Sequence, residues 1–167
     1  LELFPTRQGF DRYLGIPYSN EMEPVPLYRN EERIESLGTG EEQEKLTRLY
    51  TDEGIQFIRD NQDNPFFLCI AFSMPHVPLH ASDAFAGTSA RGLYGDVIEE
   101  IDFHVGRVLD TLESLDLDRK TLVIYTSDNG PWLWWGDLAG SPEPFQGGKE
   151  TNWEGGFRVP CVMRWPG

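Results

Sequence analysis

The order of helix-like and strand-like stretches constrains the fold of this chain more than any other feature of its sequence. Apolar residues recur at helical spacing over residues 40–61 and 92–115, and continuous apolar runs occupy residues 66–72 and 121–126. A shorter apolar run follows at residues 159–165. Strands that alternate with helices usually pair in parallel, and continuous apolar strands are typical of a sheet buried on both faces. We therefore predict an α/β fold with a mixed, mostly parallel sheet flanked by helices.

Residues 1–38 lack a regular pattern, and we expect a long irregular segment there. Four prolines interrupt any regular element in it, namely Pro5, Pro17, Pro24 and Pro26. Thr39 is a suitable N-terminal cap for the first helix, and Asn64 and Pro65 end that helix.

The composition is that of a globular protein with an acidic surface. Hydrophobic residues make up 39% of the 167 residues, enough for one domain with a sizeable core. The formal net charge of −14 argues against nucleic acid or an anionic membrane as partner, because both require a basic face. No apolar run reaches the length of a membrane span, and no signal-peptide pattern opens the chain. The chain starts at Leu1 rather than Met and has no closing element after the last strand, so we expect a piece of a longer protein.

The two cysteines, Cys69 and Cys161, each lie within an apolar strand-like run. We expect buried free thiols, because unpaired cysteine is among the most often buried residue types. A disulfide or a metal site is the alternative, but no Cys-x-x-Cys or His/Cys cluster indicates zinc. Cysteine usage therefore leaves the compartment open.

Polar residues follow the strand-like run 121–126, and they are candidates for a metal site. In an open α/β sheet, ligands bind beyond the carboxyl ends of the strands. Asp128 and Asn129 stand at such an end, and their side-chain oxygens suit Ca²⁺ or Mg²⁺. The following Gly130 and Pro131 equally favour a simple turn, so the residues alone leave both interpretations open.

Two further groups of polar residues are candidates for binding an anion. The run 66–72 leads into a proline-rich loop that holds His76 and His80, and a stiff loop is a good mount for a hydrogen-bond donor or an acid. Lys149 follows two glycines, which let a backbone approach an anion while the lysine supplies positive charge. A solvated lysine in a flexible loop is the alternative, and the spacing does not match a phosphate-binding P-loop. His104 lies on the second helix, where we expect it to pack against or flank the core.

The loop 130–154 contains four tryptophans, Trp132, Trp134, Trp135 and Trp153. Tryptophans in a loop are costly unless they are buried or bind something. We expect them either to cap the core or to stack on a sugar ring.

Three segments resemble motifs of the sulfatase family in their residues and in their order along the chain: SMPHVPLHAS, LVIYTSDNGPW and GGKETNWEGGFRVP. TRQGFDRYLGIPYSN near the start and MRWPG at the end are also similar to that family. The likeness extends over essentially the whole chain and is nearest to the branch with arylsulfatase A and N-acetylgalactosamine-6-sulfatase. It implies an alkaline-phosphatase-like fold, with residues 1–167 as a central to C-terminal part of the catalytic domain. The N-terminal nucleophile segment and the C-terminal subdomain are then missing.

The resemblance also implies roles for individual residues. In sulfatases, an aspartate and an asparagine at this strand end bind a Ca²⁺ that also holds the sulfate, and here these are Asp128 and Asn129. Lys149 matches a lysine that contacts a sulfate oxygen, and His76 matches a histidine that contacts the sulfate or the leaving oxygen. His80 occupies a nearby position whose role varies, and we expect it at most to bind substrate. The resemblance thus favours a metal site over a simple turn at Asp128 and Asn129.

One part of the family pattern is missing. Sulfatases use a formylglycine nucleophile made from the first residue of a Cys/Ser-x-Pro-x-Arg motif, and neither Cys69 nor Cys161 begins such a motif. The family's first aspartate ligands and its upstream lysine and histidine are missing too. In the family, all of these lie before the point at which this chain begins. We therefore expect a fragment that is inactive alone.

The resemblance implies hydrolysis of sulfate monoesters of sugars or aryl alcohols, so the partner is a small molecule or a glycan. It also implies a secreted, periplasmic or lysosomal protein. Two alternatives stay open: a phosphatase or phosphodiesterase of the alkaline-phosphatase superfamily, and a non-catalytic anion-binding module. The superfamily phosphatases need more Asp and His ligands for two zinc ions, and the chain has only three histidines. The upstream sequence would separate the three.

Overall fold

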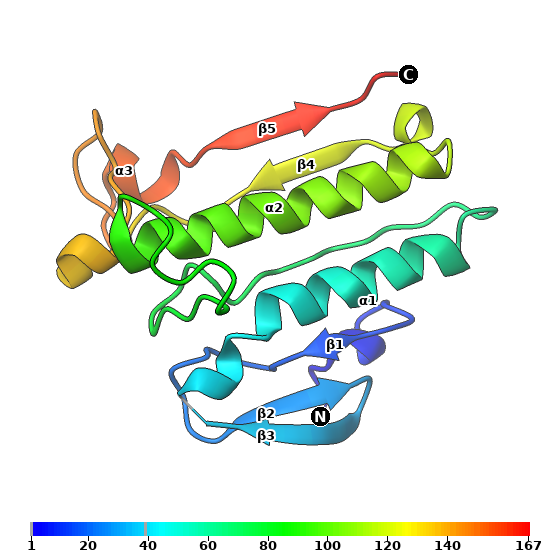
Figure 1. The fold of residues 1–167 in the computed structure, drawn as a ribbon, viewed down its shortest axis with the longest axis horizontal. Coiled ribbons are helices and arrows are strands. Elements are labelled where there is room, and N and C mark those ends of the chain that lie inside the picture. Colours follow the sequence, from blue (N-terminus) through cyan, green and yellow to red (C-terminus); the bar gives the residue numbers. More distant parts are fainter. Residues whose placement is uncertain (1, 39) are drawn as a thin grey trace. The chain divides into compact units, whose positions relative to one another are not determined.

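The computed structural model describes residues 2–38 and 40–167, and the chain divides into two compact units, Leu1–Val108 and Leu109–Gly167. The first unit contains a three-stranded sheet, a helix and most of a second helix (Figure 1). The second unit contains the end of that helix, a two-stranded sheet and short helical turns. Over the described residues, no helix combines the length and the apolar character needed to cross a bilayer.

The first unit begins with an antiparallel sheet in the order β1-β2-β3, formed by Leu14–Gly15, Val25–Arg29 and Glu32–Leu37. Asn30 turns the chain between β2 and β3 in the left-handed conformation, at φ +54°, which asparagine tolerates better than most residues. The prediction of an irregular segment over residues 1–38 is therefore wrong. Pro26 does not prevent pairing, because β1 reaches only Tyr28 and Arg29 and no described strand pairs with Pro26 on that side.

The core of the first unit lies between this sheet and the helix α1, Leu46–Asp60. Its buried members come from β2, β3 and α1 and are Val25, Leu27, Leu37, Leu46 and Tyr50. Partly buried Ile70 and Phe72 pack against the same cluster. Because each strand or helix contributes only a few apolar positions, the sheet and the helix depend on each other for burial.

The helix α1 is shorter at its N-terminus than the periodicity predicted. The chain first makes the 3₁₀ turn η2, Glu41–Gln43, and α1 starts at Leu46. Gln43 is fully buried, and its amide donates to the carbonyls of Asn20 and Gly38, each at 2.9 Å. These bonds hold the turn in place of an extra helical turn. Thr39, the expected cap, lies outside the described residues.

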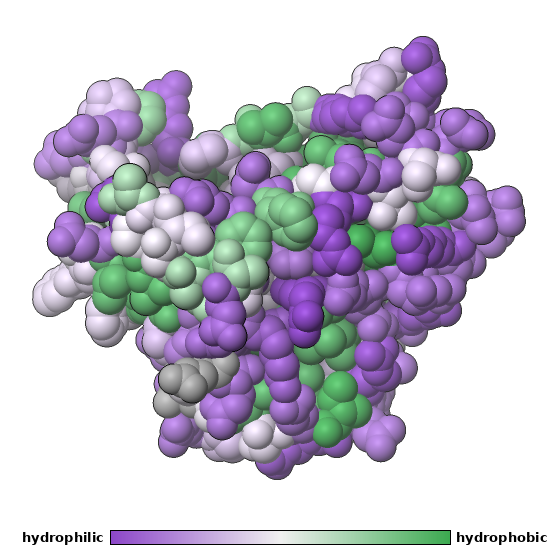
Figure 2. Space-filling view, viewed as in Figure 1, coloured by the Kyte–Doolittle hydropathy of each residue, from purple (hydrophilic) through white to green (hydrophobic). Residues whose placement is uncertain are grey.

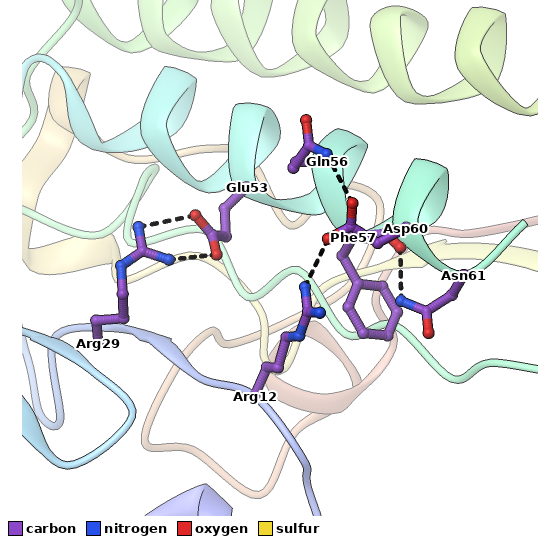
Figure 3. A network of polar contacts seen from close by, with 7 residues as sticks. All are labelled: Arg12, Arg29, Glu53, Gln56, Phe57, Asp60 and Asn61. Atoms are coloured by element: carbon purple, nitrogen blue, oxygen red, sulfur yellow. Dashed lines mark hydrogen bonds and ion pairs between the residues drawn. The ribbon is translucent and has the colours of Figure 1, made fainter.

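Polar contacts tie α1 to the N-terminal part of the chain (Figure 3). The Arg29 guanidinium makes two hydrogen bonds to the Glu53 carboxylate, and Arg12 donates to Asp60 at 2.8 Å. The Asp60 carboxylate also accepts from Gln56, and its pKa lies below the usual value because of Arg12 first and Gln56 second. Exposed ion pairs of this kind contribute little to stability. The buried apolar cluster therefore contributes most of the stability of this unit.

Residues 66–72 run extended beside α1, but they form no strand with any described residue (Figure 1). Alternate side chains face the helix: Ile70 lies against Gly54, where an added Cβ would come within 2.8 Å of it. The other side chains point away, so Phe67 is 75% exposed and Cys69 is exposed. The strand prediction is wrong here because a strand requires a hydrogen-bonded neighbour, which this segment lacks within the described chain. The expected burial of Cys69 is wrong for the same reason, although its thiol is free as predicted.

The helix α2, Gly92–Ser114, confirms the second helix prediction. Its buried face carries carboxylates as well as apolar residues. Asp96 accepts a hydrogen bond from the backbone N–H of Ser89 at 2.7 Å, and Glu100 accepts one from Ser82 at 2.9 Å. The backbone N–H groups, that of Ser89 foremost, hold the pKa of Asp96 below its usual value. The helix therefore anchors the loop that precedes it.

His104 confirms the expectation that it packs on α2. Its side chain is buried, and Nδ1 lies 3.1 Å from the Arg107 guanidinium. Burial lowers the pKa of His104, and the positive charge of Arg107 lowers it further.

The second unit contains β4, Val123–Thr126, and β5, Cys161–Arg164, which confirm the two strand predictions. They pair antiparallel, with Val123 opposite Arg164 and Thr126 opposite Cys161. The expected mostly parallel sheet is not confirmed, because both sheets of the described residues are antiparallel. The connection 127–160 leaves and rejoins the sheet at the same end, whereas a parallel pair requires a crossover to the opposite end.

Both faces of β4 and β5 carry exposed apolar side chains in the described residues. Cys161 is a free thiol as expected, but it is exposed. On the face shown in Figure 2, most of the surface is hydrophilic and the apolar side chains lie in separate patches. This agrees with the acidic composition.

Candidate functional site

Glycines join the two segments of the second unit that carry candidate residues. The backbone N–H of Gly130, just after the Asp128-Asn129 pair, donates to the carbonyl of Gly156 at 2.9 Å. A Cβ on Gly130 would lie 1.8 Å from the Gly155 carbonyl oxygen, so only glycine fits at that position. The backbone of residues 128–131, called here the tip after β4, therefore lies directly against Gly155 and Gly156. We call this contact between the two segments the glycine joint.

A second pair of backbones strengthens this joint. The N–H of Lys149 donates to the carbonyl of Pro131 at 2.9 Å, and a Cβ on Gly148 would lie 2.4 Å from that same oxygen. Gly147 adopts a left-handed φ of +80°, and a Cβ there would lie 2.5 Å from the Thr151 hydroxyl. The turn that presents Lys149 thus needs these glycines for close approach and for backbone conformation.

Asp128 and Asn129 present oxygens that suit a hard cation. The Asn129 amide nitrogen donates to the carbonyl of Gly130 at 2.9 Å, which orients the amide and leaves its oxygen as a possible ligand. Asp128 is exposed, and within the described chain no donor is hydrogen-bonded to its carboxylate. The oxygens of both residues suit a metal-binding role, and the following Gly130 is buried against Gly155.

These two residues form only part of a metal site. Ca²⁺ takes six to eight oxygen ligands, more than two side chains supply. Among residues 2–38 and 40–167, no group of three or more His, Cys, Asp or Glu side chains is arranged to hold a metal ion. A complete site would need ligands beyond those that the structure describes.

Lys149 is half-buried, and its ammonium lies over the ring of Trp132, with Nζ 4.6 Å from the ring centroid. Such a cation–π contact is worth about 0.5–1 kcal/mol at exposed sites. It restrains a long flexible side chain and keeps a positive charge beside the tip after β4. In a protein of net charge −14, this is a local site of the opposite sign.

His76 belongs to the first unit, in the loop 73–80. Its Nδ1 lies 2.7 Å from the carbonyl oxygen of Val77, and cis peptide bonds precede Pro75 and Pro78 on either side. A carbonyl can only accept, so Nδ1 carries the proton of this hydrogen bond and the ring orientation is restrained. Any proton exchange with a ligand then takes place at Nε2.

His80 lies in the same loop, where its backbone N–H donates to the sulfur of Met74 at 3.4 Å. Its Nε2 is buried, and no described residue is hydrogen-bonded to it. Buried polar atoms nearly always have a partner, so this ring nitrogen makes His80 a stronger binding candidate than its sequence position indicated.

The structure brings three of the five predicted site residues into one unit, namely Asp128, Asn129 and Lys149. His76 and His80 share one loop of the other unit. The pair Asp96 and Glu100, which hold the loop after His80 through Ser89 and Ser82, was not predicted from the sequence. Carboxylates spaced four residues apart within an apolar helical stripe are the pattern that would have revealed them.

Three of the four tryptophans of this loop line an open pocket and do not cap the core, whereas Trp153 is 56% exposed and does not line it. Trp132, Trp134, Trp135 and Glu150 line a depression of about 440 Å³ in the second unit. Glu150 was also not predicted, because a glutamate in a loop carries no distinctive pattern.

Comparisons with known proteins identify the family to which the chain is similar. The sequence model of the family described as Sulfatase matches residues 3–167. Rat N-acetylgalactosamine-6-sulfatase is 40% identical over 184 aligned positions, which cover 99% of this chain and 35% of that protein. Mouse steryl-sulfatase is 48% identical over 126 positions, which cover 72% of this chain and 20% of that protein. The chain thus spans about a third or less of the length of these curated relatives.

Solved structures of similar fold support the same assignment. A Bacteroides thetaiotaomicron protein described with the metabolism of multiple glycosaminoglycans superposes with a TM-score of 0.81 at 27% identity, covering 97% of this chain and 47% of that chain. The PsFucS1 sulfatase from Pseudoalteromonas sp. superposes with a TM-score of 0.76 at 30% identity, covering 85% of this chain and 29% of that chain. An alkaline-phosphatase-like α/β fold follows from these similarities. The sequence match and the backbone of this chain both indicate the same family, and this chain belongs to the sulfatase family.

Proposed function

We propose that this chain is part of the catalytic domain of a longer sulfatase that hydrolyses sulfate monoesters. The family match over nearly the whole chain supports this, as does the 35% share of the rat relative that the chain covers. The nucleophile is then a formylglycine outside these residues, because no Cys/Ser-x-Pro-x-Arg motif occurs here. The single observation that carries the site assignment is the glycine joint, which holds the Asp128-Asn129 tip and the Lys149 turn together by backbone hydrogen bonds.

In this proposal, Asp128 and Asn129 are two of the ligands of a Ca²⁺ ion. The exposed carboxylate and the oriented amide supply hard oxygens of the type that Ca²⁺ prefers. When bound, the ion would supply positive charge that neutralises the sulfate oxygens.

Lys149 binds a sulfate oxygen of the substrate and stabilises the negative charge on it during hydrolysis. Its place over Trp132 restricts the ammonium before substrate arrives, so less conformational entropy is lost on binding. Charge stabilisation by a positioned group of this kind is typically worth about 10²–10³-fold in rate.

His76 donates a proton or a hydrogen bond to the leaving oxygen. Because Nδ1 is held by the Val77 carbonyl, the donor is Nε2, and the ring must be protonated to act as an acid. General acid catalysis of this type contributes about 10²–10⁴-fold. His80, with its buried Nε2, binds substrate or supports its neighbour in the same loop.

The test uses the full-length protein, produced in a host that forms formylglycine, and measures kcat/KM for 4-nitrophenyl sulfate. Asp128→Ala and Lys149→Ala should each lower kcat/KM by about 10²-fold or more, and a Ca²⁺ chelator should lower it in the wild type. Matched controls are Asp137→Ala and Lys120→Ala, which remove exposed charges of the same sign in the same unit. Wild-type turnover by either site variant would refute the assignment. Hydrolysis of 4-nitrophenyl phosphate without hydrolysis of the sulfate would point to the phosphatase alternative instead.

A further inference from the structure

The pocket lined by Trp132, Trp134, Trp135 and Glu150, called here the tryptophan pocket, exposes unusually large aromatic surfaces to solvent. Trp134 is 90% exposed and Trp135 is 44% exposed. Exposed indole rings forgo the burial that stabilises most tryptophans, since an aromatic side chain buries 150–250 Å² when packed. The Trp134 ring therefore adds little to the folding of the second unit.

The backbone holds the rings at an angle to one another. Trp132 and Trp135 meet edge to face, with centroids 5.9 Å apart and planes at 67°. They lie at the start and within the 3₁₀ turn η4, Leu133–Leu138, which bends sharply at Gly136, where φ is +52°. Two angled aromatic walls and a third exposed ring form an open depression of about 440 Å³, within the range of small-molecule sites.

A carboxylate lies among these rings. Glu150 lines the tryptophan pocket and has a left-handed backbone, with φ +71°, which is uncommon for glutamate. A purely apolar partner covering the pocket would bury this carboxylate without a hydrogen-bond donor, at considerable cost. The occupant must therefore offer both an apolar face and hydroxyl or other donor groups.

The tryptophan pocket also adjoins Lys149. The Trp132 ring both lines the pocket and lies under the Lys149 ammonium, and Glu150 follows Lys149 directly in sequence. A ligand in the pocket would thus meet the Glu150 carboxylate and the Trp132 ring, over which the Lys149 ammonium lies. An anionic group at Lys149 and hydroxyl groups at Glu150 complement these charges.

We propose that the tryptophan pocket is a sugar subsite, in which the ring of a sulfated pyranoside packs its C–H face on Trp134 and Trp135. Glu150 accepts hydrogen bonds from the sugar hydroxyls, and Lys149 contacts the sulfate. The proposal rests on the sulfatase function above and deepens it, because it names a sugar sulfate as the substrate and Trp134 and Glu150 as residues that determine specificity.

The test compares two substrates in the full-length protein: 4-nitrophenyl sulfate and a monosaccharide sulfate such as N-acetylgalactosamine 6-sulfate. Trp134→Ala and Glu150→Gln should raise KM for the sugar sulfate by at least about tenfold while changing kcat little. Glu150→Gln should change kcat/KM for the aryl sulfate by no more than about threefold, because the aryl ring has no hydroxyl groups to donate to this carboxylate. Trp165→Ala is the matched control, because Trp165 is 63% exposed in the same unit but does not line the pocket.

A binding measurement separates the two proposals. The desulfated monosaccharide and the sugar sulfate are each titrated against the protein while tryptophan fluorescence is followed. Saturable quenching that Trp134→Ala abolishes and Trp165→Ala preserves supports the sugar subsite even where no sulfate ester is hydrolysed. Equal losses on both substrates in Glu150→Gln, or wild-type KM and quenching in both pocket variants, would overturn it. So would variants that change only association with another protein.

Discussion

Replacing Gly130 by alanine tests whether the glycine joint holds the candidate site together. The added Cβ would lie 1.8 Å from the Gly155 carbonyl oxygen and 3.2 Å from the Gly156 Cα. Because a carbon and an oxygen in contact lie about 3.3 Å apart, the two backbones must separate by roughly 1.5 Å. The atom in the way is backbone, so a side-chain rotation cannot relieve the clash.

The magnitude follows from the bonds that this separation breaks. The Gly130–Gly156 and Lys149–Pro131 backbone hydrogen bonds, each 2.9 Å long, join the two segments. Losing each costs about 1 kcal/mol, and up to about 3 kcal/mol where a buried donor stays unpaired. We therefore expect Gly130→Ala to lower the free energy of unfolding by about 2–4 kcal/mol. Since a misplacement of about 1 Å in a catalytic constellation can cost 10²-fold in rate, kcat/KM should fall by about that factor.

The assay is urea unfolding of the full-length protein, followed by tryptophan fluorescence, together with kcat/KM for 4-nitrophenyl sulfate. Gly106→Ala is the matched control: it lies within α2, and its added Cβ meets no atom within 4 Å. Alanine at a helical glycine should stabilise by about 0.5–1 kcal/mol and leave activity unchanged. A Gly130→Ala protein with the wild-type unfolding midpoint and wild-type kcat/KM would refute the reasoning.

Two further predictions concern the first unit. Because burial and Arg107 lower the pKa of His104, the unfolded chain binds more protons than the folded one below the unfolded pKa of about 6.5. The contribution of His104 to the free energy of unfolding should then be constant above that pH and fall as the pH drops from about 6.5 to 5. The His104→Gln variant should show a shallower fall in the free energy of unfolding over this pH range. Equal slopes for the wild type and the variant, measured by urea unfolding at each pH, would contradict this. Leu46 has no exposed surface, so Leu46→Ala should lose about 2–5 kcal/mol in urea unfolding. Leu3→Ala, at an 88% exposed position, should change stability by less than about 0.5 kcal/mol, and similar losses in both variants would disprove the core assignment.

The helices were predictable because the interactions that form them are local. In α2, the apolar stripe and the hydrogen bonds four residues apart are written into one continuous stretch, and both predicted ends lie within a residue of the observed ones. The start of α1 was less predictable, because Gln43 forms hydrogen bonds to Asn20 and Gly38, and these depend on the tertiary fold.

The strands were less predictable than the helices, because a strand forms only where a second segment pairs with it. The β-branched run ending at Thr126 became a strand, but the equally apolar run 66–72 did not, because only the former finds a hydrogen-bonded neighbour in the described chain. Conversely, the proline-rich start formed a sheet, since Pro26 meets a neighbouring strand on one side only. Periodicity measures how a segment can be buried, and not which segment pairs with it.

By itself, the sequence determined the two helices, two of the three expected strands, the family resemblance and the chemistry available at Asp128, Asn129 and Lys149. These features depend on residue type and on spacing between residues that are close together in the sequence. Only the tertiary structure decided that both sheets of the described residues are antiparallel, that glycines hold the Asp128 segment against the Lys149 turn, and that three tryptophans and Glu150 line an open depression. The physical reason is that strand pairing, close backbone contact and pocket walls all join residues distant in sequence, and no local pattern records which distant residues meet.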